Sequence, residues 1–326
     1  MQRLTRLFCA ISILAAPVSA YAQAYVDFEK DFECTVFLRK EKHTRASQGL
    51  EMSGKYVFSF QDGGHCNVYN FRTASSEPIG GFDLVSSGKD NHVNNVEFGV
   101  EKAPGGSFPM LYISNGKVGS DLEWSCFVES IKRRGKSFSS ELVQTIVLDV
   151  SKWDEKGYAR IFGAPSWLVD RKRGFLWVFS AKKRTIASVT RDPSENEYIA
   201  TKFRIPSLSE GKRVVLGVDD VLDQVIFPFE VWFTQAGCMD DGKIYYCFGV
   251  GKDMGNDGRP AHMRIYDTDS GKICARYDLV ESVPQEPEDL VLRKGYIYLN
   301  ANVGKPAVPC IYRISLPRDK KKLLYL

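Results

Sequence analysis

The sequence lacks the short motifs that mark several large enzyme classes. It contains no G-x-S-x-G nucleophile elbow, no P-loop, no H-E-x-x-H zinc motif and no glycine-rich dinucleotide fingerprint. Nucleotide-dependent chemistry and the α/β-hydrolase mechanism are therefore disfavoured. Sustained helical periodicity is also missing, since only residues 151–157 and 219–224 have the composition of one or two helical turns.

Long hydrophobic runs are absent apart from a short one at the N-terminus. Arg3 and Arg6 precede an apolar core from Leu7 to Val18, and Ala20-Tyr21-Ala22 has the small-x-small pattern of a signal-peptide cleavage site. This core is too short to span a bilayer, and no later stretch is long and apolar enough to do so. We therefore expect residues 1–22 to be a signal peptide and the protein to be exported to the periplasm, the cell surface or the medium.

Net charge is low as well. Removal of Arg3 and Arg6 lowers the formal net charge from +4 to +2 over the remaining 304 residues. A surface that binds polyanions globally is not implied, and no nucleic-acid partner is predicted. Basic clusters do occur at 132–134, 171–173, 182–184 and 320–322. Three of them fall in turns of neighbouring repeats and would suit acidic glycans if they met, but solvated turns are the simpler interpretation.

Closely spaced cysteine pairs are missing too. The seven cysteines after residue 22 are scattered without a C-x-x-C motif, which argues against a zinc ribbon or a thioredoxin-type site. An oxidising compartment permits disulfides, and Cys34–Cys310 and Cys238–Cys247 are the candidate pairs. Buried free thiols are the alternative, because cysteine also packs as a small hydrophobic residue.

What the sequence does contain is a repeated hairpin. At residues 48–58 a polar opening leads into a short apolar strand, a glycine turn and a second strand, and the same order returns at 166–177, 235–248 and 288–298. Self-similar hairpins along a whole chain predict a repeat architecture. Further predicted strands complete groups of four that open at Gln48, Asn95, Ser166, Gln235 and Glu288, as in the blades of a β-propeller.

The fifth group lacks its fourth strand, while a lone strand at residues 32–39 precedes the first group. A propeller must close its ring, commonly by completing the last blade with a strand from the other end of the chain. We therefore predict an all-β, five-bladed β-propeller domain over residues 23–326, with its last blade closed by the N-terminal strand. A two-sheet sandwich is the main alternative, but it does not explain hairpins that recur with the same opening.

The blade openings carry a resemblance. Gln48-Gly49, His92-Val93-Asn94-Asn95, Gln235-Ala236-Gly237 and Glu286-Pro287-Glu288-Asp289 resemble the openings of secreted bacterial five-bladed β-propeller proteins. The resemblance covers most of residues 32–316 and implies the architecture. Such propellers include glycan-processing enzymes and plain binding modules, so the resemblance does not choose an activity.

Polar residues recur at the start of the innermost strands, and in a propeller these starts meet at one mouth of the central channel. Convergent polar groups in such a place predict a site for a small polar ligand such as a glycan. The alternative is that these side chains bond neighbouring blades or channel water, as buried polar groups must. The set comprises Gln48, His92, Asn94, Asn95, Gln235, Glu286, Glu288 and Asp289.

Three function classes follow from this set. The leading hypothesis is a binding or scaffold protein. The second is a glycan-cleaving enzyme, hydrolase or lyase, in which His92 acts with Glu288 or Asp289 as acid and base. The third is a structural propeller with an inert channel. No metal centre or other cofactor is predicted, although the carboxylates of residues 286–289 are also the oxygen ligands that Ca²⁺ prefers.

Overall fold

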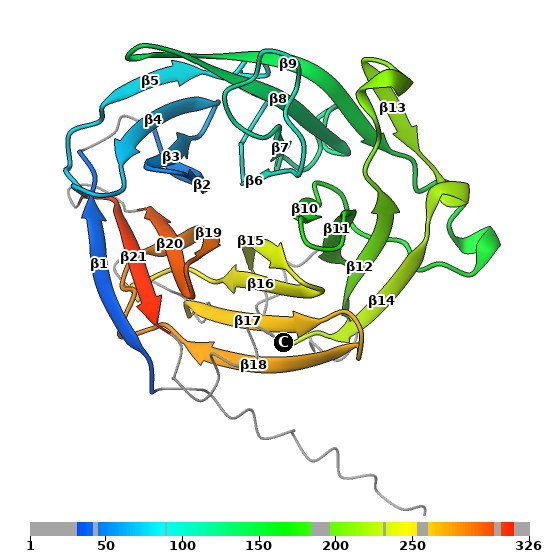
Figure 1. Cartoon of the computed structure of the whole chain (residues 1–326). Helices are drawn as coiled ribbons and strands as arrows, with labels where there is room; N and C mark the ends of the chain where they lie inside the picture. The colour runs from blue at the N-terminus through cyan, green and yellow to red at the C-terminus, as the bar shows by residue number, and fades with distance from the viewer. Residues whose placement is uncertain are drawn as a thin grey trace, which may run out of the picture.

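The chain forms a ring of five β-sheets around a central axis (Figure 1). This computed structural model describes residues 31–41, 45–88, 90–183, 196–230, 233–252, 260–302 and 308–315. The predicted five-bladed β-propeller is therefore confirmed. The described residues contain no α-helix and thus no helix able to cross a membrane. The expected signal peptide lies outside the described residues.

Each blade begins with the strand nearest the axis and continues outward. Blade 1 comprises β2 (Ser47–Ser53), β3 (Tyr56–Gln61), β4 (His65–Asn70) and β5 (Gly80–Asp83). Blade 2 comprises β6 (Asn95–Phe98), β7 (Leu111–Ser114), β8 (Ser125–Arg134), β9 (Ser137–Leu148) and β13 (Arg213–Leu216). Blade 3 comprises β10 (Ser166–Asp170), β11 (Phe175–Ala181), β12 (Glu197–Arg204) and β14 (Asp223–Pro228). Blade 4 comprises β15 (Thr234–Asp240), β16 (Lys243–Phe248), β17 (His262–Asp267) and β18 (Lys272–Asp278). Blade 5 comprises β19 (Glu286–Arg293), β20 (Tyr296–Asn302), β21 (Cys310–Ser315) and β1 (Glu33–Arg39).

The N-terminal strand closes the ring, as predicted. β1 lies antiparallel to β21, with Glu33 opposite Ser315 and Arg39 opposite Cys310 (Figure 1). The last blade therefore consists of three C-terminal strands and one N-terminal strand, and pairing with β1 covers the edge of β21 that would otherwise be open.

Blades 2 and 3 differ in detail from the prediction. For blade 3 the sequence predicts a third strand at 185–190 and a fourth at 198–205. In the structure β12 is the third strand and β14 forms the outer edge, and residues 185–190 lie outside the described residues. Blade 2 gains β13, a short strand from the segment between β12 and β14 of blade 3, which pairs parallel to β9. Short 3₁₀ turns occur at Asp154–Lys156 and Val218–Asp220, within or beside the two segments of helical composition.

Blades pack face to face through apolar and aromatic side chains. Between blades 1 and 2, Phe58 meets Phe98 edge-on at a centroid distance of 5.6 Å and Phe108 at 5.0 Å, and all three rings are buried. Large aromatics supply much of the area that such a core removes from water. The inner strands lie between two blade interfaces, so they are buried on both faces.

Buried carboxylates join the inner strands to one another. Glu97 of β6 accepts the amide protons of Val169 in β10 (2.6 Å) and Met239 in β15 (2.9 Å). Glu51 of β2 accepts from the amide of Phe98 in β6 (2.6 Å). A carboxylate that accepts amides from another blade satisfies groups that would otherwise be buried without partners. These bonds fix the spacing of the blades around the axis.

Neither candidate disulfide forms, and all seven cysteines after residue 22 are free thiols. Cys34 lies opposite Ile314 and Cys310 lies opposite Arg39, so the two cysteines sit toward opposite ends of the β1–β21 pair, about 14 Å apart along the strands. A disulfide requires Cα atoms within about 7 Å. Cys238 pairs with Tyr245 rather than Cys247, whose thiol donates to the Ala236 carbonyl at 3.0 Å. Both predicted disulfides therefore fail for the same reason: the two cysteines lie on neighbouring strands, but the strand register does not place them opposite each other.

Candidate functional site

A cavity of about 350 Å³ opens at the mouth of the channel where the inner strands begin. This volume is in the range of small-molecule sites. The cavity brings together six of the residues predicted from the sequence, contributed by blades 1, 4 and 5 and by the segment that leads into blade 2: Gln48, His92, Asn94, Gln235, Glu286 and Glu288. Ser166 and Tyr246 extend the lining, and Ser166 brings in blade 3.

A repeated irregularity places three of these side chains. In β2 the register shifts between Ser47 and Leu50, in β15 between Thr234 and Gly237, and in β19 between Pro287 and Asp289. Each shift is a β-bulge at the cavity end of an inner strand, and a bulge redirects a side chain out of the regular alternation. The bulges contain Gln48, Gln235 and Glu288, so one local device aims residues from three blades at one cavity.

Two glycines in these bulges allow the backbones to approach closely. A Cβ atom on Gly237 would lie 2.0 Å from the carbonyl oxygen of Tyr245, and one on Gly49 would lie 2.8 Å from a methyl group of Val96 in the next blade. Any larger residue would push strands apart at the cavity wall. The glycines of the Gln-Gly and Gln-Ala-Gly openings are therefore required because no larger side chain fits at these positions.

Backbone strain gathers around the same cavity. Three non-glycine residues there have positive φ: Val93 (53°), Ala164 (51°) and Phe233 (69°). Ala164 and Phe233 line the cavity, and Val93 lies between His92 and Asn94, which do. Positive φ is especially unfavourable for a β-branched residue, and strain of this kind clusters at functional sites. Gly49 donates its amide to the Val93 carbonyl at 3.1 Å and helps to hold this conformation.

Most polar groups of the cavity wall are bonded to one another. Asn94 donates to the Gln235 carbonyl at 2.8 Å, and the Gln235 amide donates to Glu286 at 2.9 Å. The Tyr246 hydroxyl lies 2.8 Å from both the Gln235 carbonyl and the Ser166 hydroxyl. These contacts tie blades 2 to 5 together and fix the side chains before a ligand arrives.

Gln48 is the exception. The residue is 2% exposed, and its Oε1 has no hydrogen-bond partner among the residues that the structure describes. A buried acceptor without a donor costs about 1–3 kcal/mol. Gln48 lines the cavity, but its Oε1 is closed off from solvent, so a ligand hydroxyl or a water molecule would supply the missing donor once the side chain turned toward the cavity.

A buried acid and a buried amine lie beside the cavity. Burial raises the pKa of Glu288 well above its usual range, and the neighbouring Glu286 acts in the same direction, while Lys40 and Asn302 oppose the shift. Burial likewise lowers the pKa of Lys40 to about 7. The Lys40 ammonium donates to Asn300 and to the hydroxyls of Ser47 and Ser59. Perturbed groups of this kind are enriched at functional sites.

His92 has a partner that the sequence did not reveal. Its Nδ1 lies 2.9 Å from a carboxylate oxygen of Asp62, on the turn after β3. Because Asp62 engages Nδ1, Nε2 is the ring nitrogen that can meet a ligand. The only sequence signal for Asp62 is its place in the turn Gln61-Asp62-Gly63-Gly64, which indicates a turn but not a partner for a histidine 30 residues away.

The two remaining candidates, Asn95 and Asp289, lie deeper and do not line the cavity. Asp289 accepts the amides of Leu50 (2.8 Å) and Val96 (3.3 Å) from two other blades and that of Leu290 (2.9 Å) from its own. Asn95 donates to Asp289 and to the Gly237 carbonyl. Both residues therefore hold blades together, and of the two predicted acid–base carboxyl groups only that of Glu288 belongs to a residue that lines the cavity.

Within the described ranges no three histidine, cysteine or acidic side chains are arranged to hold a metal ion. The predicted calcium alternative at residues 286–289 thus finds no ligand set there. Asp289 is occupied by backbone donors, and Glu286 by Gln235.

Comparisons with known proteins support the fold. No family model and no curated protein matches the sequence. Among solved structures, the tail fiber of Staphylococcus aureus phage P68 aligns with a TM-score of 0.50 and 11% identity, over 91% of this chain and 55% of that one. Glutaminyl cyclase from Myxococcus xanthus also aligns, with a TM-score of 0.47 and 12% identity, over 87% of this chain and 96% of that one. A glucose dehydrogenase aligns with a TM-score of 0.47 and 10% identity, over 87% of this chain and 100% of that one. At these identities the likeness concerns the fold alone.

Proposed function

We propose that the protein is an exported binding protein whose channel-mouth cavity takes a small polyhydroxylated ligand, the end of a glycan. The observation that carries this proposal is the unpartnered side-chain oxygen of Gln48, a buried residue that lines the cavity. A sugar hydroxyl is a donor of suitable size. Asn94, Gln235 and Glu286 line the same cavity with further amide and carboxylate groups, which match the dense donor and acceptor pattern of a sugar.

The cavity is suited to binding because its wall is fixed in advance. The bulges, the close glycine contacts and the side-chain bonds leave few rotamers to be ordered when a ligand arrives, and pre-organisation of this kind lowers the cost of binding. The volume of about 350 Å³ suits one or two sugar rings rather than a long chain.

The test is a binding screen of residues 23–326 against a panel of neutral mono- and oligosaccharides by calorimetry. We expect Gln48→Leu, which keeps the size of the side chain but removes the acceptor, to weaken binding of the best ligand about tenfold. The control is Glu155→Gln, an exposed residue of the 3₁₀ turn Asp154–Lys156. Equal affinity of wild type and Gln48→Leu would remove the basis of the proposal.

A second candidate function, glycan cleavage, is favoured by one observation. A carboxyl group with a raised pKa, Glu288, shares the cavity with a histidine oriented by Asp62. Glu288 would protonate the leaving oxygen, and His92 would activate water or abstract a proton. In the same screen, products released by wild type but not by Glu288→Gln or His92→Ala, with binding retained, would establish the enzyme. Binding without products would establish the binding protein.

A further inference from the structure

A second cavity, of about 510 Å³, lies on the opposite face of the ring. Inner strands β2 and β6 begin at the candidate site, and β8 runs in the same direction as β6 because each is antiparallel to β7. The β2–β3 and β8–β9 turns are therefore at the far end. The second cavity is lined by these turns and by the β4–β5 connection, so it lies between blades 1 and 2.

Three cations line this second cavity: Lys55, Arg133 and Lys136. All three side chains are exposed. Among the described residues none of them forms an ion pair with an acidic group, whereas the neighbouring Lys132 pairs with Glu141. The one acidic residue in the lining is Glu77. The cavity thus carries an excess of positive charge, although the net charge of the whole chain is small.

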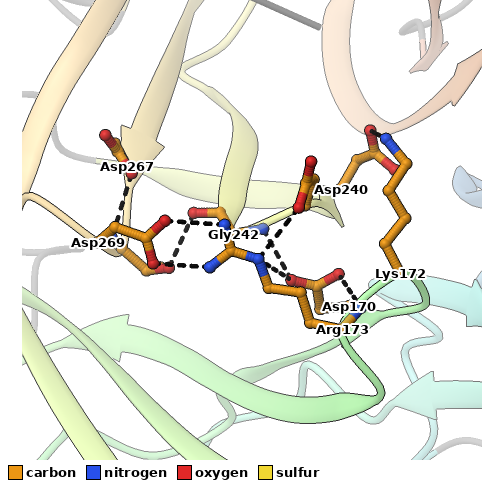
Figure 2. A network of polar contacts seen from close by, with 9 residues as sticks. Asp170, Lys172, Arg173, Asp240, Gly242, Asp267 and Asp269 are labelled. Atoms are coloured by element: carbon orange, nitrogen blue, oxygen red, sulfur yellow. Dashed lines mark hydrogen bonds and ion pairs between the residues drawn. The ribbon is translucent and has the colours of Figure 1, made fainter. Parts of the chain in front are cut away.

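Another basic turn on this face shows the contrast. At the β10–β11 turn, Arg173 donates to both oxygens of Asp269 (2.6 and 2.8 Å) and to Asp241, and Lys172 pairs with Asp240 at 2.9 Å (Figure 2). Those cations are neutralised within the protein and serve its fold. Exposure alone therefore does not explain why the cations of the second cavity lack acidic partners.

Aromatic rings hold two of the unpaired cations in place. The Arg133 guanidinium lies 5.4 Å from the ring centre of Tyr56 and 6.0 Å from that of Phe138, and the Lys55 ammonium lies 5.7 Å from Tyr56. Both rings are themselves packed against Phe108. Cation–π contacts attract and orient a charged group without neutralising it. The cations are therefore positioned and still able to meet an anion.

From these features we infer that the second cavity binds a short acidic oligosaccharide, a sugar chain that carries sulfate or carboxylate groups. The cavity is larger than a single oxyanion needs, and its lining adds Asn70 and Ser75 for hydroxyl groups and Pro78 and Ile79 for the apolar faces of sugar rings. Arginine and lysine bind oxyanions through charge-assisted hydrogen bonds. This site is separate from the channel-mouth cavity and does not depend on the function proposed for it.

The test measures binding of three fluorescently labelled tetrasaccharides to residues 23–326: a heparin-derived one for sulfate, an oligogalacturonate for carboxylate and cellotetraose as the neutral reference. We expect at least one acidic tetrasaccharide to bind, more weakly in 300 mM than in 50 mM NaCl, and cellotetraose not to compete for this site. Lys55→Gln and Lys136→Gln should each weaken binding about tenfold. Glu77→Gln should strengthen it a few-fold, because a repulsive charge is removed.

The matched control is Lys272→Gln, which removes an exposed lysine from β18 in blade 4. It should leave the affinity unchanged. Lys55 and Lys136 are exposed, so both variants should fold, and urea unfolding checks this. The inference is overturned if neither acidic tetrasaccharide binds, if Lys55→Gln and Lys136→Gln bind as wild type does, or if Lys272→Gln weakens binding equally. If Gln48→Leu weakened binding of the acidic tetrasaccharide and Lys136→Gln did not, the ligand would bind at the channel-mouth cavity and not at the second cavity.

Discussion

Asp289 offers a sharp test of how the ring is held together. Its carboxylate accepts three backbone amides, two of them from other blades, at 2.8, 3.3 and 2.9 Å. Asp289→Ala would leave these buried donors without a protein partner, at about 1–3 kcal/mol each. Water entering the space left by the side chain would bond some of these donors and so recover part of the lost free energy. We therefore expect a loss of about 3–5 kcal/mol in the free energy of unfolding.

Urea unfolding at pH 7, followed by tryptophan fluorescence, measures this loss. Asp121→Ala serves as the control, because Asp121 is exposed and should change stability by less than about 0.5 kcal/mol. Asp289→Asn keeps one acceptor oxygen and should lose an intermediate amount. A loss below about 1 kcal/mol in Asp289→Ala would refute the view that this carboxylate joins the blades.

Three further predictions concern a glycine, a histidine and the N-terminus. Gly237→Ala should lose about 2–4 kcal/mol of stability, because its Cβ would meet a backbone carbonyl at 2.0 Å, whereas Gly217→Ala, with open space, should be near neutral in the same urea assay. Burial lowers the pKa of His262 to about 4 from 6.5, so the folded state excludes a proton that the unfolded state takes up below pH 6.5. Stability should therefore fall as the pH drops from 6.5 to 4, by about 3 kcal/mol more in wild type than in His262→Gln, measured by urea unfolding across that range. Export should remove residues 1–22, and N-terminal sequencing of the secreted protein should start at Gln23; an intact Met1 would contradict this.

The repeat could be predicted from the sequence because the same hairpin order, a polar opening, an apolar strand, a glycine turn and a second strand, recurs along the chain. In blades 1 and 4 the inner strand also needs a small residue where two backbones approach, so a glycine follows the glutamine at both openings. The closing strand could be predicted because the fifth group lacked an outer strand. The position of β13 could not be predicted, because nothing in its four residues, which lie between two strands of blade 3, indicates that they pair with β9 of the preceding blade.

The candidate site was predictable in part for the same reason. Six of eight polar residues reach one cavity because the blade openings converge. The bulge at the start of β19 decides that Glu288 lines the cavity while Asp289 turns toward the other blades, and composition does not reveal a bulge. The pairing of His92 with Asp62 and the position of the buried Lys40 depend on contacts between blades. The second cavity is hidden in the sequence because Lys55 and Arg133 come from different blades.

Contact between a sugar hydroxyl and Gln48 is the key feature of the proposed ligand site at the channel mouth. A crystal structure of residues 23–326 soaked with the best neutral saccharide from the screen would show whether this contact forms. We predict a hydroxyl oxygen within 3.2 Å of Gln48 Oε1 and ring atoms between Glu286 and Asn94. A saccharide bound elsewhere, with Gln48 bonded only to water, would contradict it.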